Sequence, residues 1–353
     1  YTSGTTGKPK GIIRENGGHA VAMKFSMDYV YDVQPGEVYW AASDFGWVVG
    51  HSYIAYAPLI NGNSTIIYEG KPVRTPDAGA FWRVIEEYKV SVFFTAPTAF
   101  RAIRREDPEA TLLQQYDLSS LRAQFVAGER CDASTLEWLQ DILKVPVIDH
   151  WWQTESGYPM LSKLLKLGTY PVKPGSAGKP VPGFDVAILD HNGKPQGPNE
   201  EGMLMIRYPL APGALCNLWQ DTERFKRSYL GLVNGYYFSG DGAYMDEDGY
   251  VFVTGRVDDV INVAGHRLST ADMEEIIAAH PAVSECAVVG RYDALKGQVP
   301  VGLTVLKEGA HISEEQLQKE LIQMVRDKIG AVASFKQSFI VNTLPKTRSG
   351  KIL

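Results

Sequence analysis

Short apolar segments that alternate with amphipathic ones place the tightest limit on the fold of this chain. Three runs have the pattern of buried strands that end in turn or polar residues: Val90 to Thr95, Ala123 to Ala127 and Val145 to Asp149. The stretches between them, Pro97 to Glu106 and Ala133 to Leu143, have the pattern of helices. Strands and helices that alternate in this way predict βαβ units around a largely parallel sheet.

The carboxyl ends of these predicted strands are the first place to look for a binding site. In open α/β sheets, ligands bind in the crevice outside the carboxyl ends of the strands. Thr95, the pair Gly128-Glu129 and the segment from His150 to Glu155 follow the three strands. We therefore expect these residues to meet at one edge of the sheet.

Beyond Tyr170 the sequence changes to a β-rich pattern. Glycines, prolines and turn dipeptides such as Asn192-Gly193 and Asp248-Gly249 separate short alternating runs as far as Tyr250. These features predict hairpins.

A third pattern begins after Arg256. Helix patterns at Ser269 to His280 and Ser313 to Ile329 accompany apolar runs at Glu285 to Val289 and Val299 to Leu306. This arrangement predicts a compact α+β unit.

A chain of 353 residues is long enough for two domains. We expect an α/β protein in which residues 1–257 form the C-terminal part of a large domain, with mainly parallel sheets and a β-rich subdomain. Residues 258–353 would form a small α+β C-terminal domain.

Composition argues against two kinds of partner. The 35 basic and 41 acidic residues give a net charge of -6, which provides no basic field for a nucleic-acid backbone. The most apolar stretch, Trp47 to Ile60, contains His51, Ser52 and Pro58 and is no membrane span. We expect a soluble protein that binds neither nucleic acid nor membrane.

The three cysteines share no metal-ligand or redox spacing. Cys131, Cys216 and Cys286 are far apart in the sequence. We expect buried free thiols in a reducing compartment.

The segment Tyr1 to Gly11, YTSGTTGKPKG, is the strongest local signal for function. Its glycines let backbone N–H groups converge on an anion, and its hydroxyl and lysine side chains add donors and positive charge. A Walker A loop has four residues between its glycines and Ser or Thr after the lysine. Here two residues separate Gly4 from Gly7, and Pro9 follows Lys8. The segment predicts a phosphate-binding loop of another kind.

Further motifs continue along the whole chain. They are GWVVGHSY at 46–53, APTAFRAI at 96–103, HWWQTES at 150–156, YFSGDGAYMDEDGY at 237–250, TGRVDDVINVAGHR at 254–267 and LPKTRSGK at 344–351. In this order they resemble the adenylate-forming superfamily of acyl-CoA synthetases, adenylation domains and luciferases. The first two resemble the acetyl- and propionyl-CoA synthetase branch.

The resemblance implies ATP, magnesium and coenzyme A as ligands. Thr154 would contact the α-phosphate, and Glu155 would hold magnesium through its carboxylate. Lys351 would be the catalytic lysine of adenylation, which bridges carboxylate and α-phosphate oxygens. The remaining ATP-binding residues would be Thr2, Ser3, Gly4, Thr5, Thr6, Gly7, Lys8, Gly128, Glu129, Arg130, Asp149, His150, Trp151, Trp152, Gln153, Asp241, Arg256 and Arg267. Of these, Asp241 would accept the ribose hydroxyls.

The same resemblance implies a moving C-terminal domain and a path for coenzyme A. Asp258 would be the hinge between an adenylating and a thioester-forming orientation. Ala264 and Gly265 would line the pantetheine tunnel, and Arg326 could meet a phosphate of coenzyme A. The turn that contains Ala278, His280 and Val283 resembles a minor metal site of backbone carbonyls, with a structural turn as the alternative.

The acyl pocket would be lined by Val48, Val49, Ala127 and Trp152. Acetate-specific members tend to have Thr and Val where Val49 and Ala127 stand, so the wider and more apolar pocket predicts propionate. Acetate is the alternative acid. An adenylation module for a carrier protein needs a carboxylate to neutralise an amino-acid ammonium group, and these four residues provide none. A nucleotide-binding fragment without turnover is the remaining alternative.

The chain begins with Tyr1 directly at the loop. We expect it to lack roughly the first third of a full-length member. The resemblance favours the cytoplasm, or the mitochondrial matrix in a eukaryote, and it suggests a lysine acetyltransferase and deacetylase that act on Lys351.

Overall fold

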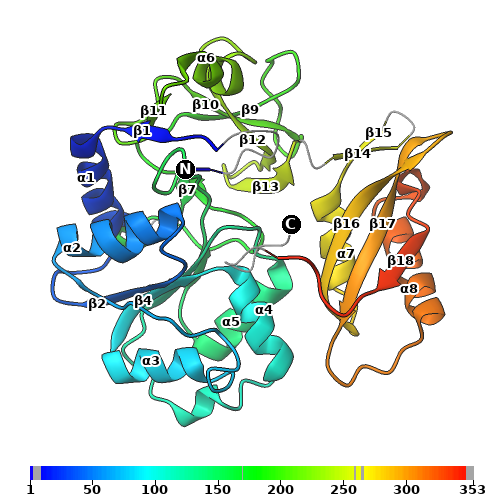
Figure 1. Cartoon of the computed structure of the whole chain (residues 1–353), viewed down its shortest axis with the longest axis horizontal. Coiled ribbons are helices and arrows are strands. Elements are labelled where there is room, and N and C mark those ends of the chain that lie inside the picture. Colours follow the sequence, from blue (N-terminus) through cyan, green and yellow to red (C-terminus); the bar gives the residue numbers. More distant parts are fainter. Residues whose placement is uncertain (3–8, 169, 258–259, 264–265, 347–353) are drawn as a thin grey trace.

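The computed structural model describes residues 1–2, 9–168, 170–257, 260–263 and 266–346. Three larger sheets organise this part of the chain (Figure 1). No helix in the described ranges is long and apolar enough to cross a bilayer.

The first sheet is parallel throughout, with strand order β3-β2-β4-β5-β6. Its strands are β2 (Val38–Ala42), β3 (Ser64–Thr65), β4 (Val90–Thr95), β5 (Ala123–Val126) and β6 (Val147–Asp149). The predicted parallel sheet is confirmed, and all six residues of β4 are buried. A strand that is covered on both faces needs such a continuous apolar run.

Helices cover both faces of this sheet. Helices α3 (Ala80–Tyr88), α4 (Pro97–Glu106) and α5 (Ala133–Leu143) pack on the face that carries Trp40 and Phe93. The other face carries Tyr39 and Phe94. It packs on α1 (Asn16–Phe25), α2 (Ala57–Asn61) and the π-helical segments η1 (Ser26–Val30) and η2 (Gly50–Tyr56). Neighbouring residues of a strand therefore enter two different cores.

The second sheet is antiparallel, with strand order β13-β12-β10-β9. Its strands are β9 (Val186–Leu189), β10 (Gly202–Arg207), β12 (Tyr236–Met245) and β13 (Val251–Arg256). The β12–β13 hairpin turns at Asp248-Gly249, where Gly249 has a φ of 81°, as the turn dipeptide predicted. Two short pairs accompany the sheet: β1 (Ile12–Arg14) with β11 (Leu215–Leu218), and β7 (Leu161–Ser162) with β8 (Lys179–Pro180).

Short helical segments complete this region. They are α6 (Thr222–Phe225), the π-helical η5 (Lys226–Leu230), and the single turns η3 (Leu113–Gln115) and η4 (Leu165–Leu167).

The third sheet belongs to the predicted α+β unit. It contains β14 (Val260–Val263), β15 (His266–Ser269), β16 (Val283–Asp293), β17 (Gly297–Leu306) and β18 (Gln337–Ile340). Helices α7 (Thr270–Ala278) and α8 (Glu314–Lys328) share a core with it, and the turn η6 (Ala331–Ala333) precedes β18. The predicted α/β class is confirmed. The domain boundary at residues 257–258 stays a prediction, because 258–259 lie outside the described residues.

Candidate active site

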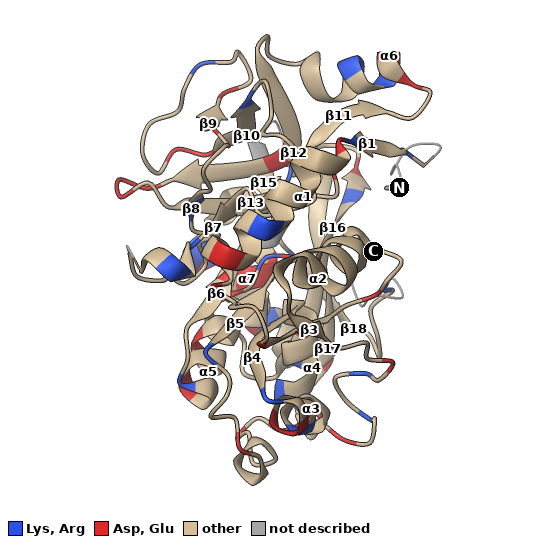
Figure 2. Cartoon of the chain, turned by 90° about the vertical axis from the view of Figure 1, so that its left-hand side faces the viewer, with Lys and Arg blue, Asp and Glu red and all other residues tan. Residues whose placement is uncertain are grey.

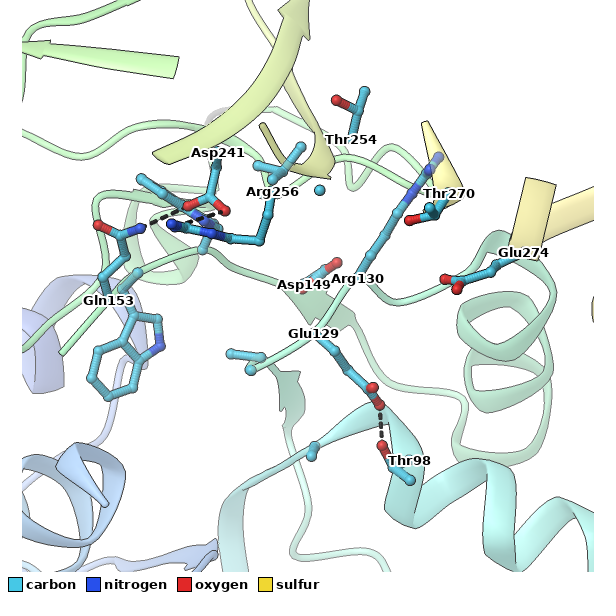
Figure 3. Close-up of a pocket in the computed structure, with 18 of the residues that line it drawn as sticks. Thr98, Glu129, Arg130, Asp149, Gln153, Asp241, Thr254, Arg256, Thr270 and Glu274 are labelled. Carbon is cyan, nitrogen blue, oxygen red and sulfur yellow. Dashed lines mark hydrogen bonds and ion pairs between the residues drawn. The ribbon is translucent and has the colours of Figure 1, made fainter. Parts of the chain in front are cut away.

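A cavity of about 1370 Å³ opens at the carboxyl ends of β4, β5 and β6. Strands β12 and β13 and the α+β unit supply its other walls (Figure 3). The predicted site residues that line it are Thr2, Val48, Val49, Ala127, Gly128, Glu129, Arg130, Asp149, His150, Trp151, Trp152, Gln153, Thr154, Glu155, Asp241 and Arg256. Residues up to 254 positions apart in the sequence thus face one cavity, as the crevice rule for parallel sheets predicted.

The ends of the predicted phosphate loop meet beside this cavity. The backbone N–H of Thr2 donates to the carbonyl of Lys10 over 3.0 Å, and the N–H of Lys10 donates to the carbonyl of Thr2 over 2.9 Å. Ser3, Gly4, Thr5, Thr6, Gly7 and Lys8 lie outside the described residues. The two bonds hold Thr2 and Lys10 side by side at the cavity, and this pair is called the loop base below.

A tight turn presents Thr154 and Glu155. The backbone N–H groups of Ser156 and Gly157 both donate to the carbonyl of Gln153, over 3.1 and 3.0 Å. Behind the turn, the guanidinium of Arg14 donates to the carbonyl of Thr154. Burial lowers the pKa of Arg14, and the Glu155 carboxylate opposes that shift. The turn is therefore held from its inner side, away from the cavity.

Glu155 is buried. Its Oε1 accepts a hydrogen bond of 2.6 Å from the hydroxyl of Tyr229 and lies 3.5 Å from Nζ of Lys10. A buried charge needs such partners, because desolvation is costly. Within the described ranges, no group of three or more His, Cys, Asp or Glu residues could hold a metal ion.

The predicted ribose site joins the second sheet to this turn. Asp241 and Arg256 are paired across β12 and β13. Nε2 of Gln153 donates to Asp241 Oδ2 over 2.7 Å, and Nη1 of Arg256 lies 3.6 Å from Asp241 Oδ1 (Figure 3). A Cβ atom at Gly240, where φ is 78°, would lie 2.4 Å from Arg256 Nη2. The positive φ favours glycine there, and a larger residue would also displace the Arg256 guanidinium.

Glu129 and Arg130, which were predicted to bind ATP, form the nucleotide wall of the cavity together with Gly128, and this wall carries a charged cluster. Oε1 of Glu129 accepts from Nη1 of Arg101 over 2.9 Å, and the Thr98 hydroxyl also donates to this oxygen. Arg130 points instead to α7, where its Nη1 and Nη2 lie 3.4 Å from Asp272 and 2.7 Å from Glu275. Glu129 therefore contacts α4, whereas its neighbour Arg130 contacts α7.

Asp149 also lines the cavity and is buried. Burial raises the pKa of its carboxyl to about 8, and the backbone N–H of Cys131, 3.3 Å from Oδ2, opposes the rise. The carboxyl is mostly protonated at neutral pH.

His150 has no ring nitrogen left for a nucleotide. Its Nδ1 lies 2.7 Å from the carbonyl of Val126, which requires the proton on Nδ1, and its Nε2 accepts from the hydroxyl of Tyr31 over 2.8 Å. Burial lowers the pKa of the imidazole to about 4, so the ring is neutral. His150 packs the floor of the cavity.

The predicted acyl pocket lies where η2 meets the strand ends. Val48, Val49, Ala127 and Trp152 line the cavity together with Phe94. The indole of Trp152 stands edge-on to Tyr53, with ring centroids 5.3 Å apart and an angle of 82° between the planes. Tyr53 is fully buried and its hydroxyl donates to Ser26 over 2.9 Å. The tryptophan therefore has a rigid support.

Several predicted residues do not join the described site. Arg326 is exposed on α8 and does not line the cavity. The turn of His280 is held by a contact of 2.7 Å between Nε2 and Glu320 Oε2, which favours the structural interpretation of the Ala278 to Val283 segment. Asp258, Ala264, Gly265 and Lys351 and the side chain of Arg267 lie outside the described residues. Cys131 and Cys286 are buried free thiols, whereas Cys216 is exposed.

Sequence reasoning missed the residues that support the site. Arg14, Arg101, Tyr229 and Tyr237 were not predicted to contact it. Each makes a hydrogen bond to a site residue at least 28 positions away in the sequence. The one signal that the sequence offers for such a contact is a polar residue inside an otherwise apolar segment.

Comparisons with known proteins agree with this geometry. A family model described as AMP-binding enzyme matches residues 1–213. The chain belongs to the AMP-binding enzyme family. A second model, AMP-binding enzyme C-terminal domain, matches residues 272–351 of this AMP-binding enzyme. The predicted membership is thereby confirmed.

Named relatives and a solved structure cover the whole chain. It is 54% identical to the human mitochondrial acyl-CoA synthetase short-chain family member 3 and 47% identical to the propionate–CoA ligase of Escherichia coli K12. These matches cover 100% of the chain but only 52% and 57% of the relatives. The crystal structure of an anthranilate CoA ligase with anthranoyl-AMP superimposes with a TM-score of 0.85 at 28% identity, and the match covers 100% of this chain and 64% of that one.

Proposed function

We propose that the protein ligates a short-chain carboxylic acid, propionate in preference to acetate, to coenzyme A with consumption of ATP. In the first step a carboxylate oxygen attacks the α-phosphorus of ATP and pyrophosphate leaves. In the second step the thiol of coenzyme A attacks the acyl carbon, AMP leaves and the thioester forms. The observation that carries this proposal is one cavity that combines a phosphate-loop base, the Thr154-Glu155 turn and an apolar pocket.

In this proposal, polar groups of the chain hold the nucleotide at several points. Thr154 contacts the α-phosphate, and Asp241 accepts the ribose hydroxyls. The contacts of Gln153 and Arg256 with Asp241 support this role, because they hold the carboxylate on the cavity wall. Arg267 and the loop from Thr2 to Lys8 supply further phosphate contacts.

Magnesium is proposed at Glu155. Magnesium in nucleotide sites is usually bound through one or two carboxylates together with substrate phosphates. A single buried carboxylate next to the loop base fits that pattern. When bound, the ion would neutralise phosphate charge, and Glu155 would hold it beside the loop.

The acyl pocket supports a short acid. Ala127 and Val49 present a small apolar wall, and Trp152, supported by Tyr53, limits the depth. Propionate fits this argument better than acetate, which is the alternative acid. None of the four predicted pocket residues can neutralise an α-ammonium group, and this argues against a carrier-protein module for amino acids.

The second step requires parts of the chain beyond the described site. Lys351 serves adenylation, Asp258 is the hinge, and Ala264, Gly265 and Arg326 contact coenzyme A. Acetylation of Lys351 by a lysine acetyltransferase would remove its charge, and a deacetylase would restore it. A cytoplasmic location is proposed, with the mitochondrial matrix as the alternative in a eukaryote.

The test separates the two half-reactions in the full-length protein. Wild-type enzyme should show acid-dependent exchange of pyrophosphate into ATP and should form acyl-CoA, with kcat/KM higher for propionate than for acetate. Lys351→Ala should lose the exchange but retain thioester formation from supplied propionyl-adenylate. AMP binding without either activity would support the binding-only alternative, and exchange that depends on an amino acid would support the carrier-protein alternative.

A further inference from the structure

Tyr229 lies between the two charged side chains that face the loop base. It is 5% exposed on η5, and its hydroxyl is 2.6 Å from Nζ of Lys10 and 2.6 Å from Oε1 of Glu155. A lysine ammonium can only donate. The hydroxyl therefore accepts from Lys10 and donates to Glu155.

This bridge leaves the two carboxylate oxygens of Glu155 in different states. Oε1 is engaged by Tyr229 and Lys10. No hydrogen bond reaches Oε2 within the part of the chain that the structure describes. One oxygen is thus held by the protein, and the carboxylate is oriented with the other available to a cation.

Tyr237 makes a similar contact with Gln153, on the other side of Thr154 in the same turn. Its ring is stacked on that of Tyr229, with centroids 5.4 Å apart and an angle of 9° between the planes. The hydroxyl donates to Oε1 of Gln153 over 2.9 Å, which directs Nε2 of Gln153 toward Asp241. The two hydroxyls therefore hold the two side chains that flank Thr154.

Both rings are held in place by burial. Tyr229 is 5% and Tyr237 is 1% exposed, and both belong to the core cluster that also contains Tyr39 and Phe94 of the first sheet. A phenolic hydroxyl donates one hydrogen bond, so each buried ring fixes the position of one acceptor.

We propose that Tyr229 is a positioning residue that orients Glu155 for a nucleotide-bound divalent cation. We also infer that Tyr237, stacked on it, separately orients Gln153 for the nucleoside. This inference rests on the proposed function, because it assigns Glu155 to the cation. Nζ of Lys10 lies 3.5 Å from Glu155 Oε1 in the structure. If the Tyr229 hydroxyl were removed, Lys10 could pair with this carboxylate directly and compete with the cation.

The test uses Tyr229→Phe and Tyr237→Phe in the full-length protein, because phenylalanine retains the stacked ring. Mn²⁺ serves as the probe for magnesium. Its affinity is measured by electron paramagnetic resonance with α,β-methylene ATP, and AMP affinity is measured by calorimetry without metal. Tyr244→Phe is the matched control, since Tyr244 is also stacked on an aromatic ring, Phe252, at 4.8 Å.

We expect Tyr229→Phe to weaken Mn²⁺ binding roughly tenfold or more, the effect of losing a hydrogen bond to a charged group, and to leave AMP binding unchanged. Tyr237→Phe should weaken AMP binding several-fold and leave Mn²⁺ binding unchanged. Tyr244→Phe should change neither. Equal Mn²⁺ affinity of Tyr229→Phe and wild type, or equal losses of Mn²⁺ and AMP binding in both variants, would overturn the inference.

The outcome is separable from the proposed function. If wild type bound Mn²⁺ and nucleotide but formed no acyl-CoA, the ligase proposal would fail while the binding comparison would still decide the role of Tyr229. If wild type with the nucleotide analogue bound no Mn²⁺, the assignment of Tyr229 would be wrong.

Discussion

Ala127 contributes a single methyl group to the wall of the acyl pocket, directly after β5. Ala127→Val would add two methyl carbons in a position that is 5% exposed, so the pocket should shorten. One methylene in an apolar pocket is worth about 1–3 kcal/mol, or roughly 10- to 200-fold in kcat/KM. We expect the ratio of kcat/KM for propionate over acetate to fall by a factor in this range. Steady-state kinetics with both acids measure it, and an unchanged ratio would remove Ala127 from the pocket.

Asp149 should make stability depend on pH. Its pKa in the folded state, about 8, lies above the ordinary value of 3.8, so the folded protein binds the proton more tightly than the unfolded chain. The stability that this proton contributes is complete below pH 3.8 and is lost as pH rises toward 8, by about 1 kcal/mol per pH unit. Asp149→Asn, which imitates the protonated carboxyl, should therefore be more stable than wild type at pH 8.5, and the advantage should shrink toward pH 5. Thermal unfolding of both proteins at these two pH values measures this, and parallel pH profiles would contradict it.

The residues that were hardest to predict share one property: their partners are distant in sequence. The motif containing Glu155 was recognisable, yet its burial depends on Tyr229, 74 positions later. The charge state of Asp149 depends on its burial in the folded protein, which no local pattern encodes. Residue types could be predicted, whereas their neighbours could not.

At the scale of elements, Asp132 joins the start of α5 to α4. Its Oδ1 caps the helix by accepting from the N–H of Thr135 over 2.8 Å, and its Oδ2 accepts from Nε of Arg101 over 3.0 Å. Burial opposes ionisation, but Arg101 and the hydrogen bonds prevail and lower the pKa of this carboxyl. The contribution to stability is therefore present above pH 4 and lost as pH falls further.

Asp132→Ala should destabilise the protein by about 1–3 kcal/mol at pH 7, because the cap and a partner of Arg101 are both lost. Asp221→Ala is the control: Asp221 caps α6 through Arg224 N over 3.1 Å at an exposed position, and should cost less than about 1 kcal/mol. Urea unfolding compares the two. Equal losses would show that Arg101 adds nothing to the cap.

Elements with continuous apolar runs were predictable, and those shaped by packing were not. Strand β4 and helices α4 and α5 have the predicted limits, because β-branched and aromatic runs and helical periodicity are local signals. The π-helical segment η2 was not predicted, since its geometry depends on the strands and helices around it. The order β3-β2-β4-β5-β6 also required contacts between distant strands.

At the scale of the whole molecule, polar contacts beside the cavity join the α+β unit to the segment after β5 and to β13. Figure 2 marks the acidic and basic residues on the ribbon, and they occur on several elements. Arg130, on the nucleotide wall, lies within ion-pair distance of Asp272 and Glu275 on α7, and Ser269 donates to the carbonyl of Thr254 over 3.2 Å. These few polar contacts are the kind that a domain can break and remake when it moves.

Arg130→Ala should therefore shift the position of the α+β unit relative to the first sheet without unfolding either. The side chains of Asp272 and Glu275 are 45% and 38% exposed, so each pair is worth at most about 1 kcal/mol, and the equilibrium constant for the described arrangement should fall roughly two- to thirtyfold. Fluorescence energy transfer between labels on α5 and α8 of the full-length protein measures the shift. Salt at high concentration should bring the transfer efficiency of wild type toward that of the variant, because it screens exposed pairs.

Arg122→Ala is the matched control, since Arg122 pairs with Glu37 at 2.8 Å within the large unit and its loss should leave the transfer efficiency unchanged. Identical transfer in Arg130→Ala and wild type would mean that apolar contacts, rather than these charges, hold the two units together.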